Sequence, residues 1–223
     1  MWHKMKDPVS CLTHMAWAIL AVPVTIVLVV LASVLATPAH VVSFAIFGVS
    51  LILLYTASTV YHLIKLPRLQ LFLRKLDHSM IFVLIAGTYT PMALITLQGA
   101  WGDAWGISIL SVIWGIAAVG IVLKIFFFNI PRWISTLMYI LMGWISVIAI
   151  VPLSSALPVG GLILLFAGGI VYTAGGVIYA IKRPVLRFKY FGFHEVFHIF
   201  VMAGSALHVV LMFVYILPAG FVY

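Results

Sequence analysis

Long apolar runs recur along the whole chain, and they constrain its fold more than any other feature of the sequence. Each run approaches the roughly 20 residues that a helix needs to cross the hydrocarbon core of a bilayer. Of the 223 residues, 65% are hydrophobic and only 7% are charged, whereas soluble domains carry about 25% charged residues. The sequence therefore predicts an integral membrane protein, with little chain left for a soluble domain.

Polar and proline-containing breaks divide this apolar sequence into seven runs, which we interpret as one all-α transmembrane domain covering residues 1–223. The runs are too long for the strands of a membrane barrel and do not alternate between apolar and polar residues. The first run is longer than the apolar part of a signal peptide, so we expect it to be retained as a helix. The predicted helices cover about 14–36, 40–64, 77–97, 105–124, 132–151, 159–181 and 194–217.

A few residue types refine this prediction. The chain has one cysteine, Cys11, so it forms no internal disulfide. Pro23 and Pro91 lie inside predicted helices, where a membrane protein tolerates the resulting kink. The sixth predicted helix is rich in glycine, which predicts close backbone packing against a neighbouring helix. Its glycines include Gly168, Gly169, Gly175 and Gly176.

The basic residues all fall on one side of the predicted membrane. They precede the first helix or lie between helices two and three, four and five, and six and seven. A wrong helix count would scatter them, so the distribution supports seven. The positive-inside rule then predicts a cytoplasmic N-terminus and an external C-terminus. Insertion and anionic headgroups account for the net charge of +8, so we expect no nucleic-acid partner. The twelve are Lys4, Lys6, Lys65, Arg68, Arg74, Lys75, Lys124, Arg132, Lys182, Arg183, Arg187 and Lys189.

Several polar residues lie at the predicted cytoplasmic ends of three helices. Ser58 and His62 end the second helix, Asp77 begins the third, and His194 and His198 begin the seventh. Four residues advance a helix by about 6 Å and turn it about 40° past a full turn. Ser58 and His62 therefore share one helix face, and so do His194 and His198. Two imidazoles at this spacing can bind one metal ion, and His62 at the same depth would supply a third.

Three protein ligands and a water are typical of a catalytic zinc site, whereas a structural site is closed by four ligands. Zinc would lower the pKa of the water and polarise a substrate carbonyl. Asp77 would orient or deprotonate that water, and Ser58 would hydrogen-bond nearby. Simpler interpretations also exist: histidines facing headgroups, Asp77 capping the third helix, and Ser58 packing between helices.

The segment HEVFH at 194–198 also satisfies the His-Glu-x-x-His pattern of zinc proteases. Such a protease usually needs a further carboxylate ligand from another membrane segment. Besides Asp77, the remaining acidic residues are Asp7, which we place in the tail, and Asp103, which we place in an outer loop. We interpret Glu195 as an acid favoured at a helix N-terminus by the helix dipole, not as a catalytic base.

Two further histidines need an interpretation. His208 lies ten residues beyond His198, which is too far along the helix axis for both to bind one ion. We expect His208 to form a buried hydrogen bond instead. His14, at the start of the first predicted helix, is interpreted as a polar neighbour on the cytoplasmic side.

Three motifs stand out: SxxYH at 58–62, LDHSMIFVLIAGTYTP at 76–91 and HxxxH at 194–198. With them the chain resembles the hemolysin III proteins of the progestin and adipoQ receptor family, which includes the adiponectin receptors. The resemblance covers nearly all seven predicted helices. The N-terminal DPVSCLTH also resembles the family's acidic-x-x-Asn-x-x-(Ser/Thr)-His pattern, with Ser10 in place of the usual Asn.

This resemblance implies a barrel-like bundle of seven helices with a zinc ion near the cytoplasmic face. Carried over by position, His62, His194 and His198 would be the ligands, with Asp77 and Ser58 close to the metal-bound water. Members of the receptor branch are regarded as zinc-dependent lipid amide hydrolases acting on ceramide-like substrates, and the bacterial branch is named after a cytolytic phenotype. For a short chain without a folded N-terminal extension, the resemblance implies a bacterial plasma (inner) membrane.

The leading functional hypothesis is a zinc-dependent intramembrane hydrolase that cleaves an amide or ester bond of a membrane lipid. The principal alternative is a non-enzymatic receptor or sensor with a structural zinc, or a cytolytic protein. A monomeric pore is disfavoured, because no predicted helix carries a continuous polar stripe. A His-Glu-x-x-His metalloprotease is the third hypothesis.

Overall fold

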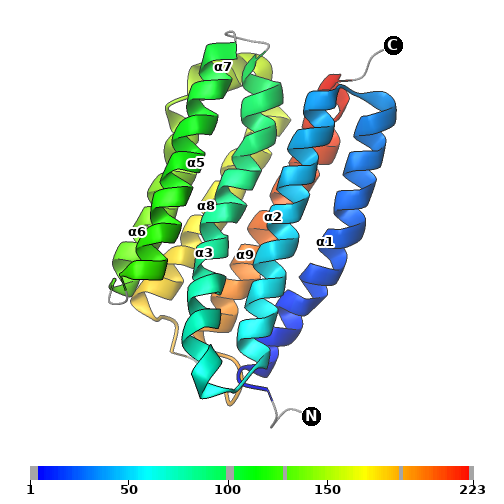
Figure 1. The fold of residues 1–223 in the computed structure, drawn as a ribbon. Helices are drawn as coiled ribbons and strands as arrows, with labels where there is room; N and C mark the ends of the chain where they lie inside the picture. Colours follow the sequence, from blue (N-terminus) through cyan, green and yellow to red (C-terminus); the bar gives the residue numbers. More distant parts are fainter. Residues whose placement is uncertain (1–4, 99–102, 128–129, 186–187, 221–223) are drawn as a thin grey trace.

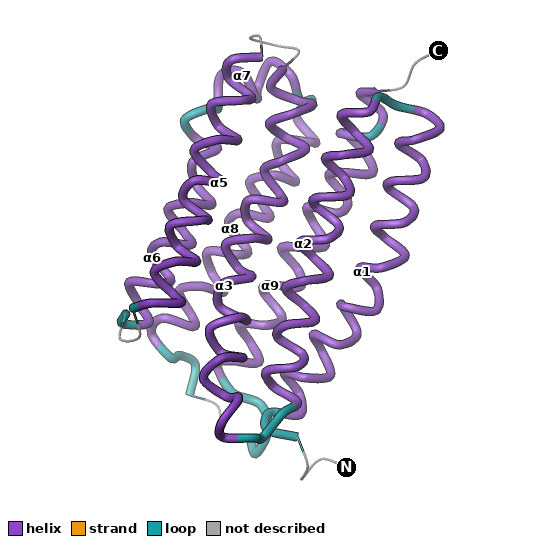
Figure 2. The backbone as a smooth tube through the Cα atoms, in the orientation of Figure 1, coloured by secondary structure: helices purple, strands orange, loops and turns teal. Residues whose placement is uncertain are grey.

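The protein is almost entirely helical in a computed structural model that describes residues 5–98, 103–127, 130–185 and 188–220. No strand occurs among these residues, and Figure 2 shows helices joined by short loops. Six helices are long and apolar enough to cross a membrane, and a bent pair makes a seventh when it is counted as one span. The predicted all-α membrane fold is confirmed.

The elements follow one another with short connections. They are α1 (Pro8–Leu35), α2 (Pro38–Leu63), α3 (Pro67–Pro91) with the π-helix η2 (Met92–Thr96), α5 (Asp103–Phe126), α6 (Arg132–Gly143), the 3-10 helix η3 (Trp144–Val147), α7 (Ile150–Ala156), α8 (Val159–Ile181), α9 (Phe193–Leu211) with the π-helix η4 (Met212–Ile216), and the 3-10 turn η5 (Pro218–Gly220). The bounds of α8 are those predicted, 159–181.

Two helices start well before their predicted first residues. The first begins at Pro8, not at 14, and the third begins at Pro67, not at 77. In both, a proline occupies the first turn, where its fixed φ suits a helix and its missing N–H leaves no bond unmade. The helix starts were predicted from the apolar runs. The first turns of α1 and α3 lie before those runs and contain polar residues, so the prediction left them out.

The fifth predicted helix, 132–151, is not continuous. It is broken into α6, η3 and α7, and the two arms are bent by 57°. Pro152 lies in the first turn of α7, because it cannot donate the backbone hydrogen bond that would continue a helix through it. At the break, the Tyr89 hydroxyl donates to the Gly143 carbonyl at 2.7 Å and accepts from the Ser146 N–H at 2.7 Å. These bonds satisfy backbone groups that the break leaves free.

The helices form a closed ring. Each packs on the next in the order α1, α2, α3, α5, α6, α8 and α9, and α9 packs back on α1. The start of α1 and the turn η5 lie at opposite ends of the bundle in Figure 1. All the described Lys and Arg belong to segments at the end where α1 begins, whereas Lys4 and Arg187 lie outside the described residues. Which end faces the cytoplasm remains a prediction.

The outer and inner faces of the ring differ as a bilayer requires. Large apolar side chains such as Ile19, Val34 and Ile163 are exposed on the outside, where lipid would solvate them. Aromatic residues such as Phe44 and Phe82 are fully buried between the helices. This distribution is that of an integral membrane protein with lipid around its whole circumference.

The glycines of α8 allow it to approach α9 closely, as predicted. A methyl group at Gly175 would lie 2.7 Å from the Cβ of Phe200, and one at Gly168 would overlap the ring of His208. Gly176 faces α6 instead, and Gly169 has no described atom within 4 Å of the place a methyl would take. Only part of the glycine pattern therefore serves the contact between α8 and α9.

Candidate metal centre

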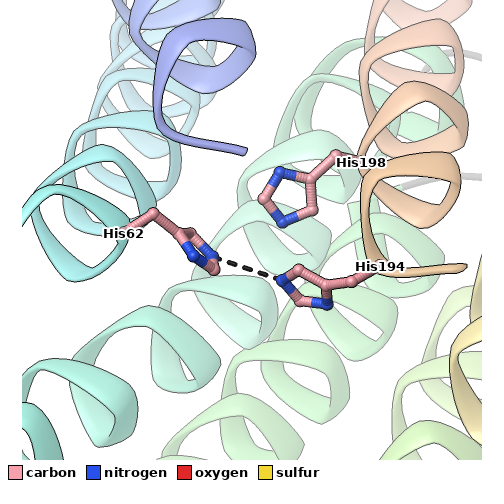
Figure 3. Close-up of side chains that lie close together, drawn as sticks. All are labelled: His62, His194 and His198. Carbon is pink, nitrogen blue, oxygen red and sulfur yellow. Dashed lines mark hydrogen bonds between the residues drawn. The ribbon is translucent and has the colours of Figure 1, made fainter. Parts of the chain in front are cut away.

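Three histidines meet where α2 ends and α9 begins. His62 comes from the last turn of α2, and His194 and His198 come from the first turns of α9; their rings gather in one place in Figure 3. One ring nitrogen from each lies within 4.8 Å of the other two. His62 and His198 are buried, and His194 is half-buried. The predicted convergence of three imidazoles is confirmed, and the group could hold a metal ion.

The separation of two of these rings suits tetrahedral coordination. The Nε2 atoms of His62 and His194 are 3.3 Å apart. Two nitrogens each about 2.0–2.1 Å from one tetrahedral zinc ion would lie about 3.3–3.4 Å from each other. Imidazole nitrogens also suit copper, iron and nickel. The structure therefore supports a metal site, and zinc is the metal that we propose below.

Asp7 orients the ring of His62, a role that the sequence analysis missed. Its Oδ2 lies 2.9 Å from Nδ1 of His62. Because a carboxylate can only accept, Nδ1 carries the proton, and Nε2 can offer its lone pair to a metal. The Asp7 N–H also donates to the His62 carbonyl at 3.1 Å. The prediction that Asp7 lies in a tail is wrong, because Pro8 opens α1 and Asp7 occupies its N-cap position.

The surroundings of Asp7 keep its carboxyl ionised. Partial burial raises its pKa, but the hydrogen bond and charge of His62, together with the charge of Lys6, more than offset burial. The pKa of Asp7 therefore lies below its ordinary value. Lys6 Nζ is 3.6 Å from the same carboxylate oxygen, Oδ2.

Glu195 caps α9 and ties it to α1. Its Oε2 accepts a hydrogen bond from the Gly192 N–H at 2.7 Å, and its Oε1 accepts one from the Ser10 hydroxyl at 2.7 Å. The interpretation of Glu195 as an N-terminal helix acid is confirmed. Ser10, which replaces the family's usual Asn, thus links the first helix to the helix that carries His194 and His198.

Asp77 and Ser58 lie beside the histidines. Both are buried, both line the cavity that contains the three imidazoles, and Ser58 hydrogen-bonds to the Asp77 carboxyl. Because α3 begins at Pro67, Asp77 lies well inside the helix, and the simpler interpretation of Asp77 as a helix cap is wrong. The catalytic roles assigned to Asp77 and Ser58 remain predictions.

Two further histidines, His14 and His208, have different surroundings. The ring of His14 stacks on that of His198, with centroids 3.7 Å apart and planes at 16°. Both of its ring nitrogens are buried, with no hydrogen-bond partner among the described residues. His208 Nδ1 donates to the Gly204 carbonyl at 2.8 Å, which confirms the predicted buried hydrogen bond.

The histidines open into a cavity of about 840 Å³ inside the ring of helices. Ligand sites in proteins usually measure about 300–1,000 Å³. One end of the cavity is polar and holds the three histidines, Asp77 and Ser58. The walls continue along the bundle through apolar side chains, which include Ile85, Met92, Leu153 and Leu165. An amphipathic molecule with an apolar chain matches this lining.

A closed ring of membrane helices around a cavity with a three-histidine centre defines the class: an integral membrane protein with a candidate intramembrane metal site. The family model described as "Haemolysin-III related" matches residues 2–209. The chain is 43% identical to "Hemolysin-3" of Bacillus cereus over 217 residues, 96% of this chain and 94% of that relative. It is 38% identical to "Hemolysin-3 homolog" of Bacillus subtilis (strain 168) over 201 residues, 90% of each chain.

The chain belongs to the hemolysin III family, which confirms the resemblance found in its motifs. Both relatives come from Bacillus species, consistent with the predicted multi-pass location in a bacterial plasma (inner) membrane.

Proposed function

We propose that the protein is a zinc-dependent hydrolase that cleaves an amide or ester bond of a membrane lipid, with ceramide-like lipids as the substrate class that the family resemblance suggests. One observation carries this proposal. Three converging imidazoles and a buried carboxyl, Asp77, line a cavity whose other walls are mostly apolar. A lipid could place its polar linkage at the imidazoles and its chain along the apolar walls.

The residues present suit each role in such a reaction. His62, His194 and His198 would hold the ion, and Asp7 would keep the His62 ring in the ligating tautomer. Bound zinc supplies a Lewis acid for a carbonyl and lowers the pKa of a water. Asp77 would accept a proton from the attacking water, and its hydrogen bond from Ser58 would fix the carboxyl in place. The surrounding helices would exclude bulk water from the bond being cleaved.

The competing hypotheses account for less of this arrangement. A structural zinc in a receptor or sensor would be expected to have four protein ligands, whereas three converge among the described residues. A metalloprotease of the His-Glu-x-x-His type needs Glu195 as its base, but that carboxylate is bound to Ser10 and Gly192. The names of the two relatives favour a cytolytic activity, and this remains the second candidate function.

Replacing Asp77 separates catalysis from metal binding. Purified wild-type protein and Asp77→Ala would be compared for bound zinc and for hydrolysis of a short-chain N-acylsphingosine. We expect Asp77→Ala to keep most of its zinc and to lose turnover by about 10²-fold or more, because general acid–base catalysis contributes about that much. Thr88→Ala is the control, because Thr88 lines the same cavity three turns further along α3.

Each outcome of this comparison decides between the functions. Equal turnover in wild type and Asp77→Ala would remove Asp77 from the reaction. Bound zinc with no turnover of amide or ester lipids in wild type would refute the hydrolase and favour a receptor, a sensor or a cytolytic protein. Loss of turnover in Thr88→Ala as large as in Asp77→Ala would show that cavity shape, not the carboxyl, is responsible.

A further inference from the structure

Four basic side chains line the cavity: Arg74 is exposed, Lys75 donates to the Ile125 carbonyl, and Lys124 and Arg132 are the other two. Lys124, in the last turn of α5, and Arg132, the first residue of α6, line the same cavity as the three histidines and are half-buried. Arg68, Lys182 and Arg183, at the same end of the bundle, are exposed. Contact with headgroups at the membrane surface accounts for the exposed residues, but it gives no reason for the placement of Lys124 and Arg132.

Aromatic rings and a hydroxyl hold these two cations at the cavity wall. The Arg132 guanidinium lies over the Tyr179 ring, 4.6 Å from its centroid, and 5.6 Å from that of Phe193. Lys124 Nζ donates to the Ser135 hydroxyl at 2.5 Å. One guanidinium nitrogen of Arg132, Nη1, is enclosed by protein and has no hydrogen-bond acceptor among the described residues. Enclosed charged donors are usually hydrogen-bonded in proteins, and this nitrogen is free to donate to an anionic group in the cavity.

Among the described residues, no carboxylate pairs with Lys124 or Arg132. The ion pairs among the described residues involve only Asp7, with Lys6 and His62. Asp77 is engaged with Ser58, and Glu195 with Ser10 and Gly192. Asp103 begins α5, whereas Lys124 lies in the last turn of that helix.

A third cation adds to the imbalance. Arg74 is exposed, lines the same cavity and repels Lys124 electrostatically. Uncompensated charge at a partly buried site is unfavourable, so this end of the cavity attracts an anion.

We propose that Lys124 and Arg132 form a subsite for the anionic group, a phosphate or carboxylate, of a lipid whose chain fills the apolar part of the cavity. A guanidinium binds such groups through two parallel hydrogen bonds, and an ammonium adds a point charge beside it. Basic pockets between membrane helices are known to bind anionic lipid headgroups. The apolar walls beyond the histidines distinguish a lipid from a free anion, because inorganic phosphate would leave them unfilled.

The subsite would give the lipid substrate of the proposed function a negative charge. Only the statement that the bound lipid is a substrate rests on that proposed function. Binding itself can be measured without turnover. Three probes would be added to the full-length protein in a neutral detergent and followed by native mass spectrometry. Hexadecyl phosphate carries the chain and the anion, hexadecanol the chain alone, and inorganic phosphate the anion alone.

We expect wild type to bind hexadecyl phosphate at least about tenfold more tightly than hexadecanol, and to bind inorganic phosphate much more weakly than either, because charge-assisted hydrogen bonds and chain burial act together. Arg132→Gln and Lys124→Gln should each weaken the binding of hexadecyl phosphate by about tenfold and leave the binding of hexadecanol unchanged. Arg68→Gln is the matched control, since it removes the same charge from an exposed position at the same end.

Equal affinity for hexadecyl phosphate and hexadecanol, or equal weakening by Arg68→Gln and Arg132→Gln, would overturn the subsite. Inorganic phosphate binding as tightly as hexadecyl phosphate would show that the site takes a free anion and would overturn the lipid. If Arg132→Gln does not fold, Lys124→Gln decides alone. If the protein hydrolyses N-acylsphingosine but does not prefer hexadecyl phosphate to hexadecanol, the subsite is refuted and the hydrolase stands. If it prefers hexadecyl phosphate but hydrolyses no lipid, the hydrolase alone is refuted.

Discussion

At the scale of single residues, the candidate centre depends on side chains that hold the histidines as much as on the histidines themselves. His62 is fixed by Asp7, and the start of α9 is fixed by Glu195 through Ser10. His198 lies against the ring of His14. Because a ligand that is already oriented loses little entropy on binding, these contacts should tighten metal binding.

Each proposed ligand can be tested alone. We expect His62→Ala, His194→Ala and His198→Ala each to lower zinc occupancy sharply, because a site with two remaining imidazoles loses a third of its protein ligands. Zinc per protein would be measured by mass spectrometry after gel filtration. His208→Gln is the control, because His208 lines the same cavity and hydrogen-bonds only to backbone in the described structure. Full occupancy in any of the three alanine variants would remove that residue from the coordination shell.

Asp7 should matter for metal affinity and not for the number of ligands. Asp7→Asn leaves the three imidazoles in place but weakens the hydrogen bond that orients His62, and we expect zinc affinity to fall by about 10–100-fold. A competition titration with a chelating dye would measure the change. Lys6→Gln, which removes the neighbouring charge without touching His62, should have a much smaller effect. An unchanged zinc affinity in Asp7→Asn would show that the ring needs no such support.

At the scale of elements, the close packing of α8 against α9 positions the part of the cavity wall that these two helices form. The contact depends on positions where no side chain fits, such as Gly175 against Phe200. Glycine is otherwise a poor helix residue, costing about 1 kcal/mol relative to alanine. Its presence at this position is explained by interhelical packing and not by helix formation.

Two glycines of α8 give opposite expectations for the same substitution. Gly175→Ala should lower the thermal midpoint of the detergent-solubilised protein, because its methyl would lie 2.7 Å from the Cβ of Phe200 and overpacking costs about 1–3 kcal/mol. Gly169→Ala should leave the midpoint unchanged or raise it, since no described atom lies within 4 Å. A lower midpoint in Gly169→Ala alone would contradict this account of the packing.

At the scale of the whole molecule, the ring of helices has one charged end. The basic residues gather where α1 begins, and the three histidines lie at that same end of the cavity. The positive-inside rule assigns this end to the cytoplasm, so the candidate centre is expected beneath the inner leaflet's headgroups. A lipid substrate would then enter from the inner leaflet.

Reporter fusions would test this orientation. Alkaline phosphatase is active only outside the cytoplasm, so we expect activity when it is fused after η5 and none when it is fused after α5. A fluorescent protein that matures only in the cytoplasm should give the opposite result at the two sites. Activity of the phosphatase after α5 would place the basic end, and with it the histidines, outside the cytoplasm.

The sequence predicted the helices best where apolar runs and helices coincide, as in α8. It failed where the two differ: Pro67 opens α3 in a polar segment, and the span after Arg132 is bent although its apolar run is continuous. The spacing of His194 and His198 along one helix predicted a shared face correctly. It gave no sign that Asp7 would meet His62, because no local periodicity links residues that far apart in the chain.

By itself, the sequence determined that the chain lies in a membrane, which segments form helices, and that its basic residues gather at one end, because hydropathy and charge order are properties read along the chain. Only the tertiary structure decided that α9 closes the ring against α1, that Asp7 and Ser10 reach His62 and Glu195, and that Lys124 and Arg132 turn inward. These contacts join segments that are distant in the chain. They depend on which helices are neighbours and on how those helices are positioned along one another, and both are decided by the packing of the whole bundle.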